Sequence, residues 1–214
     1  MRGYLGLPNG DDTTMLNLDR LPANVVGKKV KMVALNETHR AALMEIAKDE
    51  RIWRHYPLDG TKVEVFNAWF DESLFDAIKL VSWPFVVYNI ADERLIGSAR
   101  FESIAKEHDR LSVGGTWLHP SAWRKGFNTE MNYLLFDVAF EILGAKRVEV
   151  RVDARNEANL SGMRSFGATE EGTLRQFYLE QDGYRTDRVI FSVMQNEWPV
   201  VKTKMANKLD GRSP

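Results

Sequence analysis

One unit near the middle of the chain restricts the fold more than any other feature of the sequence. RLSVGGTWL (110–118) has the pattern of a strand, the apolar positions from Met131 to Ile142 follow the spacing of a helix with one buried stripe, and RVEVRV (147–152) alternates valine with charged residues as a second strand. A helix between two strands of one sheet returns the chain in the same direction, by a right-handed crossover. The sequence therefore predicts a parallel pair of strands.

The segments on both sides of this unit favour antiparallel pairing. Short polar turns join PFVVYNI (84–90) and LIGSARFESI (95–104) to the strand at 110–118, which is typical of a meander. GTLRQFYLE (172–180) and RTDRVIFSVM (185–194) flank a glycine-containing turn, which predicts a hairpin. A sheet with both kinds of pairing is therefore expected.

Two local patterns add detail. Thr61-Lys62-Val63-Glu64 has the spacing of a capping box and predicts the start of a helix. Gly114 and Gly115 interrupt the strand at 110–118, which indicates a β-bulge or a close backbone approach.

Composition excludes several classes of site. The chain has no cysteine, which excludes disulfides, thiolate nucleophiles and cysteine-ligated metals, and its four histidines form no His-x-x-x-His pair, so we expect no metal site. A net charge of −1 gives no bulk attraction to nucleic acid or to an anionic membrane. No apolar run approaches the roughly 18 residues of a membrane span, and the first residues lack the apolar core of a signal peptide. We therefore expect a cytoplasmic protein.

The stretch AWRKGFNTEMNYLL (122–135) lies between the predicted strand and the predicted helix. The start of a helix leaves N–H groups unpaired and carries partial positive charge. Gly126 lacks the Cβ that would keep ligand oxygens away from the backbone, and Arg124-Lys125 adds positive charge. Asn128 or Thr129 is the expected N-cap. From these residues alone the stretch is either an ordinary capped helix or a cradle for a pyrophosphate; it fits neither a P-loop nor a Rossmann fingerprint.

In their order along the chain, these segments resemble the GNAT superfamily of acyl-CoA-dependent N-acyltransferases. The phosphate turn of that family is usually written Gln/Arg-x-x-Gly-x-Gly/Ala, and this chain matches it at Gly126 and departs from it at Trp123 and Asn128. Trp-x-x-Gly-x-Asn-Thr-Glu is similar to the variant of the RimJ/RimL branch, the ribosomal-protein N-terminal acetyltransferases. Other segments that agree with this branch are Thr116–Pro120, Arg147-Val148, Asp153–Asn156, Phe166–Ala168, Glu171–Arg175, Asp182-Gly183 and Glu197–Pro199.

The resemblance covers residues 28–200 and implies a fold. That fold is α+β, an α/β/α sandwich around a mixed, mostly antiparallel twisted sheet of about seven strands. Its central parallel pair is splayed to hold acyl-CoA. Residues 1–27 are then expected as an extended leader and residues 201–214 as a basic tail. Dimers are common in the branch, and the C-terminal hairpin is the contact expected for a homodimer.

The resemblance also assigns residues to the cofactor site. Acetyl-CoA is the implied co-substrate, with no metal. The backbone N–H groups implied to hold the pyrophosphate are those of Arg124, Lys125, Gly126, Phe127, Asn128 and Thr129. The strand end at Trp117 and Leu118 would pair with the pantetheine arm, and the N–H of Leu118 would polarise the thioester carbonyl. Asn156 matches the residue that opens the second helix and contacts pantetheine, and Asn159 lies one turn further on.

The resemblance leaves the acid and the base open. Asn159 stands where the branch often has a serine suspected of protonating the departing thiolate; asparagine cannot be that acid but can donate a hydrogen bond. Tyr178 lies on a strand that borders the cleft in this family, as an acid or as a substrate contact. Glu102 and Glu149 lie on predicted strands near the cleft, either as candidate bases or as solvated residues.

Other candidates have a structural alternative. Arg175 is expected either at the edge of the cleft, binding an acidic acceptor, or on a solvated face. His119 is expected to be a loop residue. Four aromatic residues before the meander are expected in the core rather than in an acceptor groove: Trp53, Tyr56, Trp69 and Trp83.

The expected reaction is direct transfer of acetyl to a primary amine in a ternary complex, because no cysteine exists to carry an acyl group. At pH 7 a protein α-amine needs about 1.4 kcal/mol for deprotonation, whereas a lysine side chain needs about 4.6 kcal/mol. The acceptor is therefore expected to be a protein N-terminus or a small amine of low pKa. Two alternatives stay open: a longer donor such as succinyl-CoA, and a catalytically silent acyl-CoA-binding module.

Overall fold

The fold is built on one sheet of eight strands with the order β1-β2-β3-β4-β5-β6-β8-β7. The computed structural model describes residues 15–180 and 183–211, so part of the last hairpin turn lies outside the described residues. The strands are β1 (Asn24–Val26), β2 (Val30–Ala34), β3 (Trp83–Asn89), β4 (Leu95–Ala105), β5 (Arg110–Leu118), β6 (Arg147–Asp153), β7 (Thr169–Leu179) and β8 (Arg185–Met194). The β5–β6 pair is parallel and the other neighbours are antiparallel, which confirms the predicted mixed sheet.

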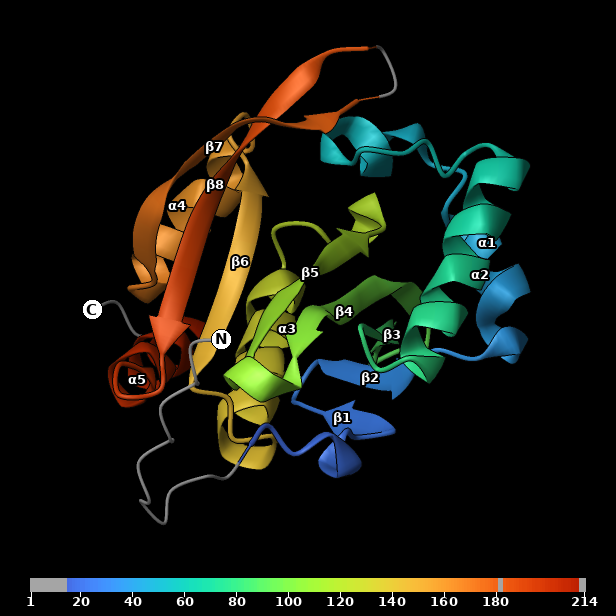
Figure 1. Ribbon diagram of the computed structural model, residues 1–214. Coiled ribbons are helices and arrows are strands. Elements are labelled where there is room, and N and C mark those ends of the chain that lie inside the picture. Colours follow the sequence, from blue (N-terminus) through green and yellow to red (C-terminus); the bar gives the residue numbers. More distant parts are fainter. Residues whose placement is uncertain (1–14, 181–182, 212–214) are drawn as a thin grey trace, which may run out of the picture.

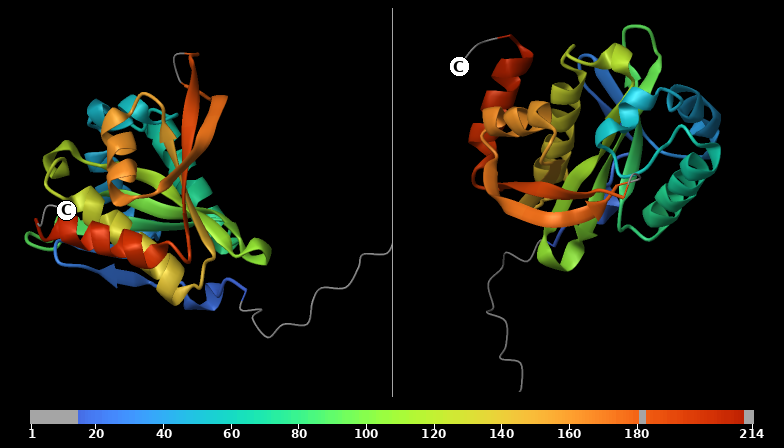
Figure 2. Two further views of the ribbon diagram at one scale, coloured as in Figure 1. Left: turned by 90° about the vertical axis from the view of Figure 1, so that its left-hand side faces the viewer. Right: turned by 90° about the horizontal axis from the view of Figure 1, so that it is seen from above.

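Helices cover both faces of this sheet, as Figures 1 and 2 show. The α-helices are α1 (Arg40–Ile46), α2 (Val63–Ile78), α3 (Phe127–Asp137), α4 (Glu157–Phe166) and α5 (Trp198–Leu209), and a π-helical turn, η6 (Val138–Ile142), extends α3. The short 3-10 helices are η1 (Leu18–Arg20), η2 (Glu37–His39), η3 (Glu50–His55), η4 (Lys106–His108) and η5 (Pro120–Ala122). Helices α1 and α2 lie on one face, and α3, α4 and α5 lie on the other.

Each face buries its own apolar cluster. The larger cluster contains Met131 and Leu135 of α3, Met163 of α4 and Val201 of α5, packed on the strands. The smaller cluster lies under α1 and α2 and is rich in aromatic rings. Trp53 and Trp69 are buried in it, which confirms their predicted place in the core, and Tyr56 packs against its edge. Trp83 packs on the larger cluster, and its Nε1 donates to Pro22 O at 3.2 Å.

Folded structure extends beyond residues 28–200 at both ends. Leu16 is completely buried, and its N–H donates to Asp109 Oδ1 at 2.6 Å. Strand β1, which lies inside the expected leader, is the eighth strand of the sheet. At the other end, α5 buries Val201 and Met205 against the larger cluster. Residues 1–14 of the expected leader and 212–214 of the expected tail lie outside the described residues.

The predicted capping box at the start of α2 is wrong. The helix begins at Val63, and Lys62 stands at its N-cap without a side-chain cap. The hydroxyl of Thr61 donates instead to Asp59 Oδ1 at 2.6 Å. A competing local turn therefore uses the side chain that the spacing assigns to the helix.

The parallel strands separate soon after they pair. Register between β5 and β6 is limited to Arg110↔Arg147, Leu111↔Val148 and Ser112↔Glu149. Beyond Ser112, β5 continues beside β4 to Leu118, while β6 continues beside β8 to Asp153. The sheet therefore opens into a V between its two central strands.

Candidate active site

The turn between β5 and α3 has the geometry of an anion cradle. Gly126 is the N-cap of α3 with φ +86°, a conformation that residues with a Cβ rarely adopt. The first intrahelical bond runs from Glu130 N to Gly126 O at 3.0 Å, so the N–H groups of Phe127, Asn128 and Thr129 precede it without intrahelical acceptors. The prediction of Asn128 or Thr129 as N-cap is wrong, because the left-handed glycine starts the helix earlier and places both residues in the first turn.

A third cation joins Arg124 and Lys125 at this turn. The Nζ atom of Lys29 donates to Lys125 O at 3.2 Å, and a Cβ on Gly126 would lie 3.5 Å from it. Lys29 is 96 residues away in sequence, so no local motif signals it. The Glu130 carboxylate, 4% exposed, accepts from the backbone N–H groups of Lys28 and Lys29 and holds the β1–β2 connection against α3.

The end of β5 presents one backbone N–H to the open side of the V. His119 N donates to Ile96 O at 2.7 Å, which points this N–H toward β4. Neighbouring N–H groups in a strand point in opposite directions, so the N–H of Leu118 points away from β4 into the gap. The N–H of Trp117 faces β4 like that of His119. Trp117 is 3% exposed, and its indole packs within the aromatic cluster. Of the two predicted residues, Leu118 is thus the one whose backbone faces the gap.

Trp123 ties the turn to this strand end. Its Nε1 donates to the carbonyl of Leu118 at 2.7 Å, and its ring is partly exposed. The ring of His119 is engaged locally, because its Nδ1 accepts from Ser121 N at 3.2 Å, which confirms a loop role for this residue.

Helix α4 begins at the open end of the V. Asn156 caps it as predicted, since its Oδ1 accepts from Asn159 N at 3.2 Å. The amide nitrogen of Asn156 therefore keeps its donors for another partner. Asn159 is half-buried in the first turn of the same helix.

The α2 face of the sheet carries a second group of candidate side chains, which are titratable. Burial raises the pKa of Glu102 above its ordinary value, although the guanidinium groups of Arg100 and Arg151 act in the opposite direction. Burial raises the pKa of Tyr178, and the charge of Glu102 raises it further. Burial also raises the pKa of Tyr56 to about 12. Glu102 thus interacts electrostatically with tyrosines from two other segments, which lie around one point of the sheet.

Glu149, the other candidate base, is already paired. Arg147 Nε lies 3.0 Å from Glu149 Oε1, and an amino group of Arg151 lies 3.3 Å from Oε2. Arg147 also binds Glu171, which in turn accepts from Ser192. Two cations therefore hold the Glu149 carboxylate in an ion-pair network.

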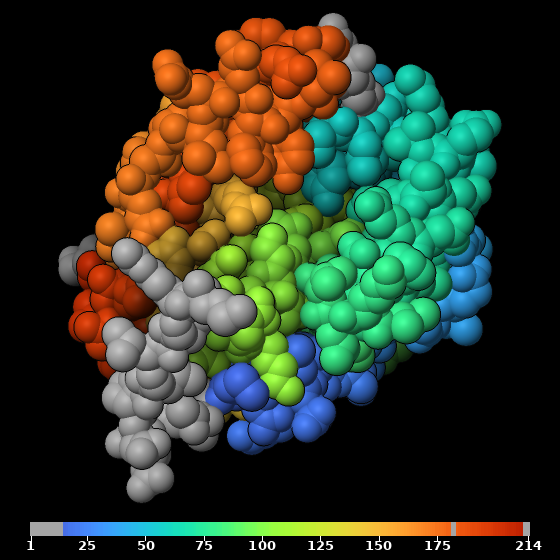
Figure 3. Space-filling view, in the orientation of Figure 1, coloured from blue at the N-terminus to red at the C-terminus, as the bar shows by residue number. Residues whose placement is uncertain are grey.

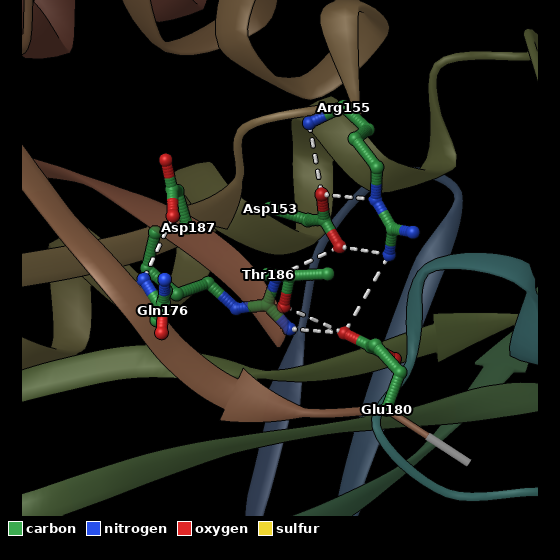
Figure 4. Close-up of polar contacts among 7 residues, drawn as sticks. Asp153, Arg155, Gln176, Glu180, Thr186 and Asp187 are labelled. Carbon is green, nitrogen blue, oxygen red and sulfur yellow. Dashed lines mark hydrogen bonds and ion pairs between the residues drawn. The ribbon is translucent and has the colours of Figure 1, made fainter. Parts of the chain in front are cut away.

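The β7–β8 hairpin is anchored by a buried polar cluster, drawn in Figure 4. Arg188 lies 2.7 Å from Asp153 and 3.3 Å from Glu180, and Thr186 donates to Glu180 at 2.8 Å. Burial would raise the pKa of Asp153, but hydrogen bonds from Arg155 and Arg188 outweigh burial and lower it to about 2. The cluster also orients Tyr178, whose ring centroid lies 4.7 Å from the Arg188 guanidinium carbon.

These elements enclose a hollow. Figure 3 shows atoms of β5 and β6 recessed between the β7–β8 hairpin on one side and the η3 and α2 region on the other. Arg175 is not part of the buried polar cluster that anchors the hairpin. It is exposed on the edge strand β7.

Within residues 15–180 and 183–211, no cluster of His, Asp and Glu side chains suits a metal ion, and no helix is long and apolar enough to cross a membrane.

Comparisons with known proteins agree with this geometry. The model of the acetyltransferase (GNAT) domain family matches residues 29–169. The uncharacterized N-acetyltransferase YoaA of Bacillus subtilis (strain 168) is 32% identical over 162 residues, 72% of this chain and 86% of that protein.

Two solved structures extend the comparison. A probable acetyltransferase of the GNAT family from Chromobacterium violaceum ATCC 12472 superposes with a TM-score of 0.77 at 27% identity, over 93% of this chain and 99% of that chain. RimJ of Mycobacterium smegmatis, in complex with CoA-disulfide, superposes with a TM-score of 0.76 at 19% identity, over 90% of this chain and 97% of that chain. At 19% identity, the likeness to RimJ shows a shared fold alone.

Proposed function

Because the chain belongs to the GNAT acetyltransferase domain family, we propose that it transfers acetyl from acetyl-CoA directly to a primary amine, in a ternary complex. The observation that carries this proposal is the open V beside the Gly126 turn, where a strand end and a helix start present backbone donors to one region. We also propose a RimJ/RimL-like specificity for an amine of low pKa. The Trp123 and Asn128 positions of the turn support that branch.

The donor would be held mainly by backbone groups. N–H groups over the range 124–129 would bind the pyrophosphate, with Arg124, Lys125 and Lys29 as its counter-charges. The N–H of Leu118 would bind the pantetheine arm or its thioester carbonyl. The free amide donors of Asn156, and the side chain of Asn159, would reach the arm from the start of α4. When bound, acetyl-CoA supplies an activated acyl group on a good leaving group.

The transfer balances without a covalent enzyme intermediate. The lone pair of a neutral amine forms a C–N bond to the thioester carbon, and the C–S bond breaks with its electron pair on sulfur. The ammonium form of the acceptor releases two protons in total, of which one ends on the thiol and one reaches solvent. Tyr178 is the proposed donor to the thiolate, since a phenol carries its proton at neutral pH and the pKa of this one is raised further by burial.

The charges beside the hollow support an acceptor that loses its proton easily. Arg100 and Arg151 both lower the pKa of Glu102. An acceptor that stayed in its ammonium form in that region would meet the positive charges of these two guanidinium groups. An α-amine needs about 3 kcal/mol less than a lysine side chain to become neutral at pH 7. A protein N-terminus or a small amine of low pKa is therefore the proposed acceptor.

A donor and acceptor panel tests this function. Acetyl-CoA at 100 times its Kd should add about 2.7 kcal/mol to the free energy of unfolding, visible as a melting shift. CoA release should then appear with peptides that have free N-termini, and not with N-acetylated copies of the same peptides. A melting shift with succinyl-CoA larger than that with acetyl-CoA would overturn the donor assignment. Binding without CoA release across the panel would instead support a silent acyl-CoA-binding module.

A further inference from the structure

We propose that Glu102 is the group that takes the proton from the acceptor amine, and that the reaction centre lies where its carboxylate covers the Gly114-Gly115 bulge of β5. The inference rests on the proposed function and adds to it the identity and the place of the base. Three observations carry it: the space that two glycines leave, the lack of a partner for Glu102, and the groups that converge on it.

Two side chains of β4 occupy the space that the glycines of β5 leave. A Cβ on Gly114 would collide with the carboxylate of Glu102, and a Cβ on Gly115 would lie 2.6 Å from Arg100 Nε. Gly115 has φ +53°, and the register between β4 and β5 shifts here. The bulge therefore lets the Glu102 carboxylate lie directly over bare backbone, which suits the close approach of a ligand.

Glu102 also differs from its rivals in having no partner. In the described part of the chain, its carboxylate makes neither a hydrogen bond nor an ion pair. Glu149 is held by Arg147 and Arg151, and the Nδ1 of His119 is used by Ser121. A carboxylate that is partly buried and unpaired is the one free to accept a proton.

Groups from four segments face this carboxylate. Arg100 comes from β4 itself, Arg151 from β6, Tyr178 from β7, and Tyr56 from the segment after η3. Burial raises the pKa of Glu102, and the two arginines moderate the rise. The two tyrosines also interact electrostatically with Glu102 and carry no charge at neutral pH. A raised pKa makes this carboxylate a better proton acceptor than an ordinary glutamate.

The path of the donor fits this place. Gly114 lies four residues before Leu118 on β5, about 13 Å in a regular strand and less across the bulge. A pantetheine arm that starts at the Gly126 turn and pairs with Leu118 therefore leads along β5 toward the bulge. This assigns the Leu118 N–H to the arm and brings the thioester carbon to Glu102. Deprotonation of the ammonium by Glu102, directly or through one water, leaves the neutral amine that forms the C–N bond.

The test combines Glu102→Gln with a pH profile. Glu102→Gln should lower kcat/KM at pH 7 by about 100-fold, and the deficit should shrink as pH rises toward the pKa of the amine, because the acceptor then loses its proton without help. The melting shift with acetyl-CoA should be unchanged. Glu102→Asp should restore part of the activity. Glu107→Gln, an exposed glutamate of η4, is the matched control and should behave as wild type.

Gly114→Ala provides an independent route to the same conclusion. Its Cβ meets the flexible end of Glu102, and Gly114 does not have a positive φ, so the variant should fold and displace the carboxylate. The Gly114→Ala/Glu102→Gln double variant should be no slower than Glu102→Gln alone. Carbon-detected NMR of the unliganded protein should show Glu102 titrating above an ordinary glutamate.

Three outcomes would overturn the assignment of Glu102: a Glu102→Gln activity within threefold of wild type, a deficit equal at every pH, or an ordinary titration of the carboxyl. Because wild type is measured in the same assay, an active wild type beside an unimpaired Glu102→Gln rejects the base and leaves the acetyltransferase proposal standing. An inactive wild type with a Glu102 that titrates normally rejects both.

Discussion

The indole Nε1 of Trp123 donates a 2.7 Å hydrogen bond to the carbonyl of Leu118, so the residue that opens the Gly126 turn also fixes the end of the strand beside it. This bond couples the two parts of the proposed donor site. It also gives a physical role to a tryptophan that departs from the general motif of the family.

Trp123→Phe removes this bond and keeps most of the ring. The loss of about 1 kcal/mol should appear in donor binding as an approximately fivefold higher Kd for acetyl-CoA, measured by calorimetry. Trp83→Phe is the control, because it removes a 3.2 Å bond to Pro22 O in the larger cluster, away from the turn. Equal effects of the two variants on Kd would contradict the coupling.

Gly126→Ala should weaken acetyl-CoA binding at least tenfold. The left-handed φ of +86° strains any other residue, and relief of that strain would turn the first N–H groups of α3 away from the pyrophosphate. Gly144→Ala carries the same kind of strain at φ +76° with no atom within 4 Å of its Cβ. It should lower the melting temperature and leave the Kd unchanged. Wild-type affinity in Gly126→Ala would remove the turn from the donor site.

Lys29→Ala should raise the Kd for acetyl-CoA about fivefold at low salt, because it removes a cation whose Nζ lies over the turn. The difference from wild type should shrink in 0.5 M salt, since exposed charges are screened. Lys31→Ala, an exposed lysine two residues further along β2, is the control. An effect independent of salt would argue for a structural role of Lys29 instead.

Asp153 should make the fold sensitive to acid. Its pKa is about 2 in the folded chain and about 3.9 in the unfolded chain, so its stabilisation of roughly 2–3 kcal/mol is nearly complete above about pH 5 and is lost progressively as pH falls toward 2. Asp153→Asn should cost about 3 kcal/mol at pH 7, because it leaves Arg188 buried with less compensation. Its urea unfolding should then change less between pH 4 and pH 2.

Glu72→Gln, on the exposed side of α2, is the control for this measurement and should keep the wild-type acid dependence. An Asp153→Asn variant with the same slope as wild type between pH 4 and pH 2 would contradict the assignment.

The sequence predicted the parts of the site that depend on local order. The strand–turn–helix–strand unit, the capping role of Asn156 and the glycine bulge in β5 all follow from short-range patterns, and the structure confirms them. The N-cap of α3 was predicted two or three residues too late, because the pattern does not show that Gly126 takes a left-handed conformation. The capping box failed because Asp59 competes for Thr61.

Contacts between distant segments could not be predicted in the same way. Lys29 reaches the turn from a position 96 residues away, and Glu102 meets the tyrosines of β7 and of the segment after η3 only when the sheet is assembled. The choice between Glu102 and Glu149 is partly local. Arg147 and Arg151 stand two residues before and after Glu149 on the same strand and pair with it. The burial of Glu102 and its interactions with other segments depend on tertiary packing.

The three-pair register between β5 and β6 has a consequence for the unliganded chain. A sheet normally has two edges, but one that parts in its middle has two more, and these expose peptide groups in the interior of the fold. A bound donor would act there as a surrogate strand. Peptide N–H groups such as that of Leu118 should then exchange rapidly with deuterium in the free protein and slowly in the complex, whereas those that face β4 should exchange slowly in both.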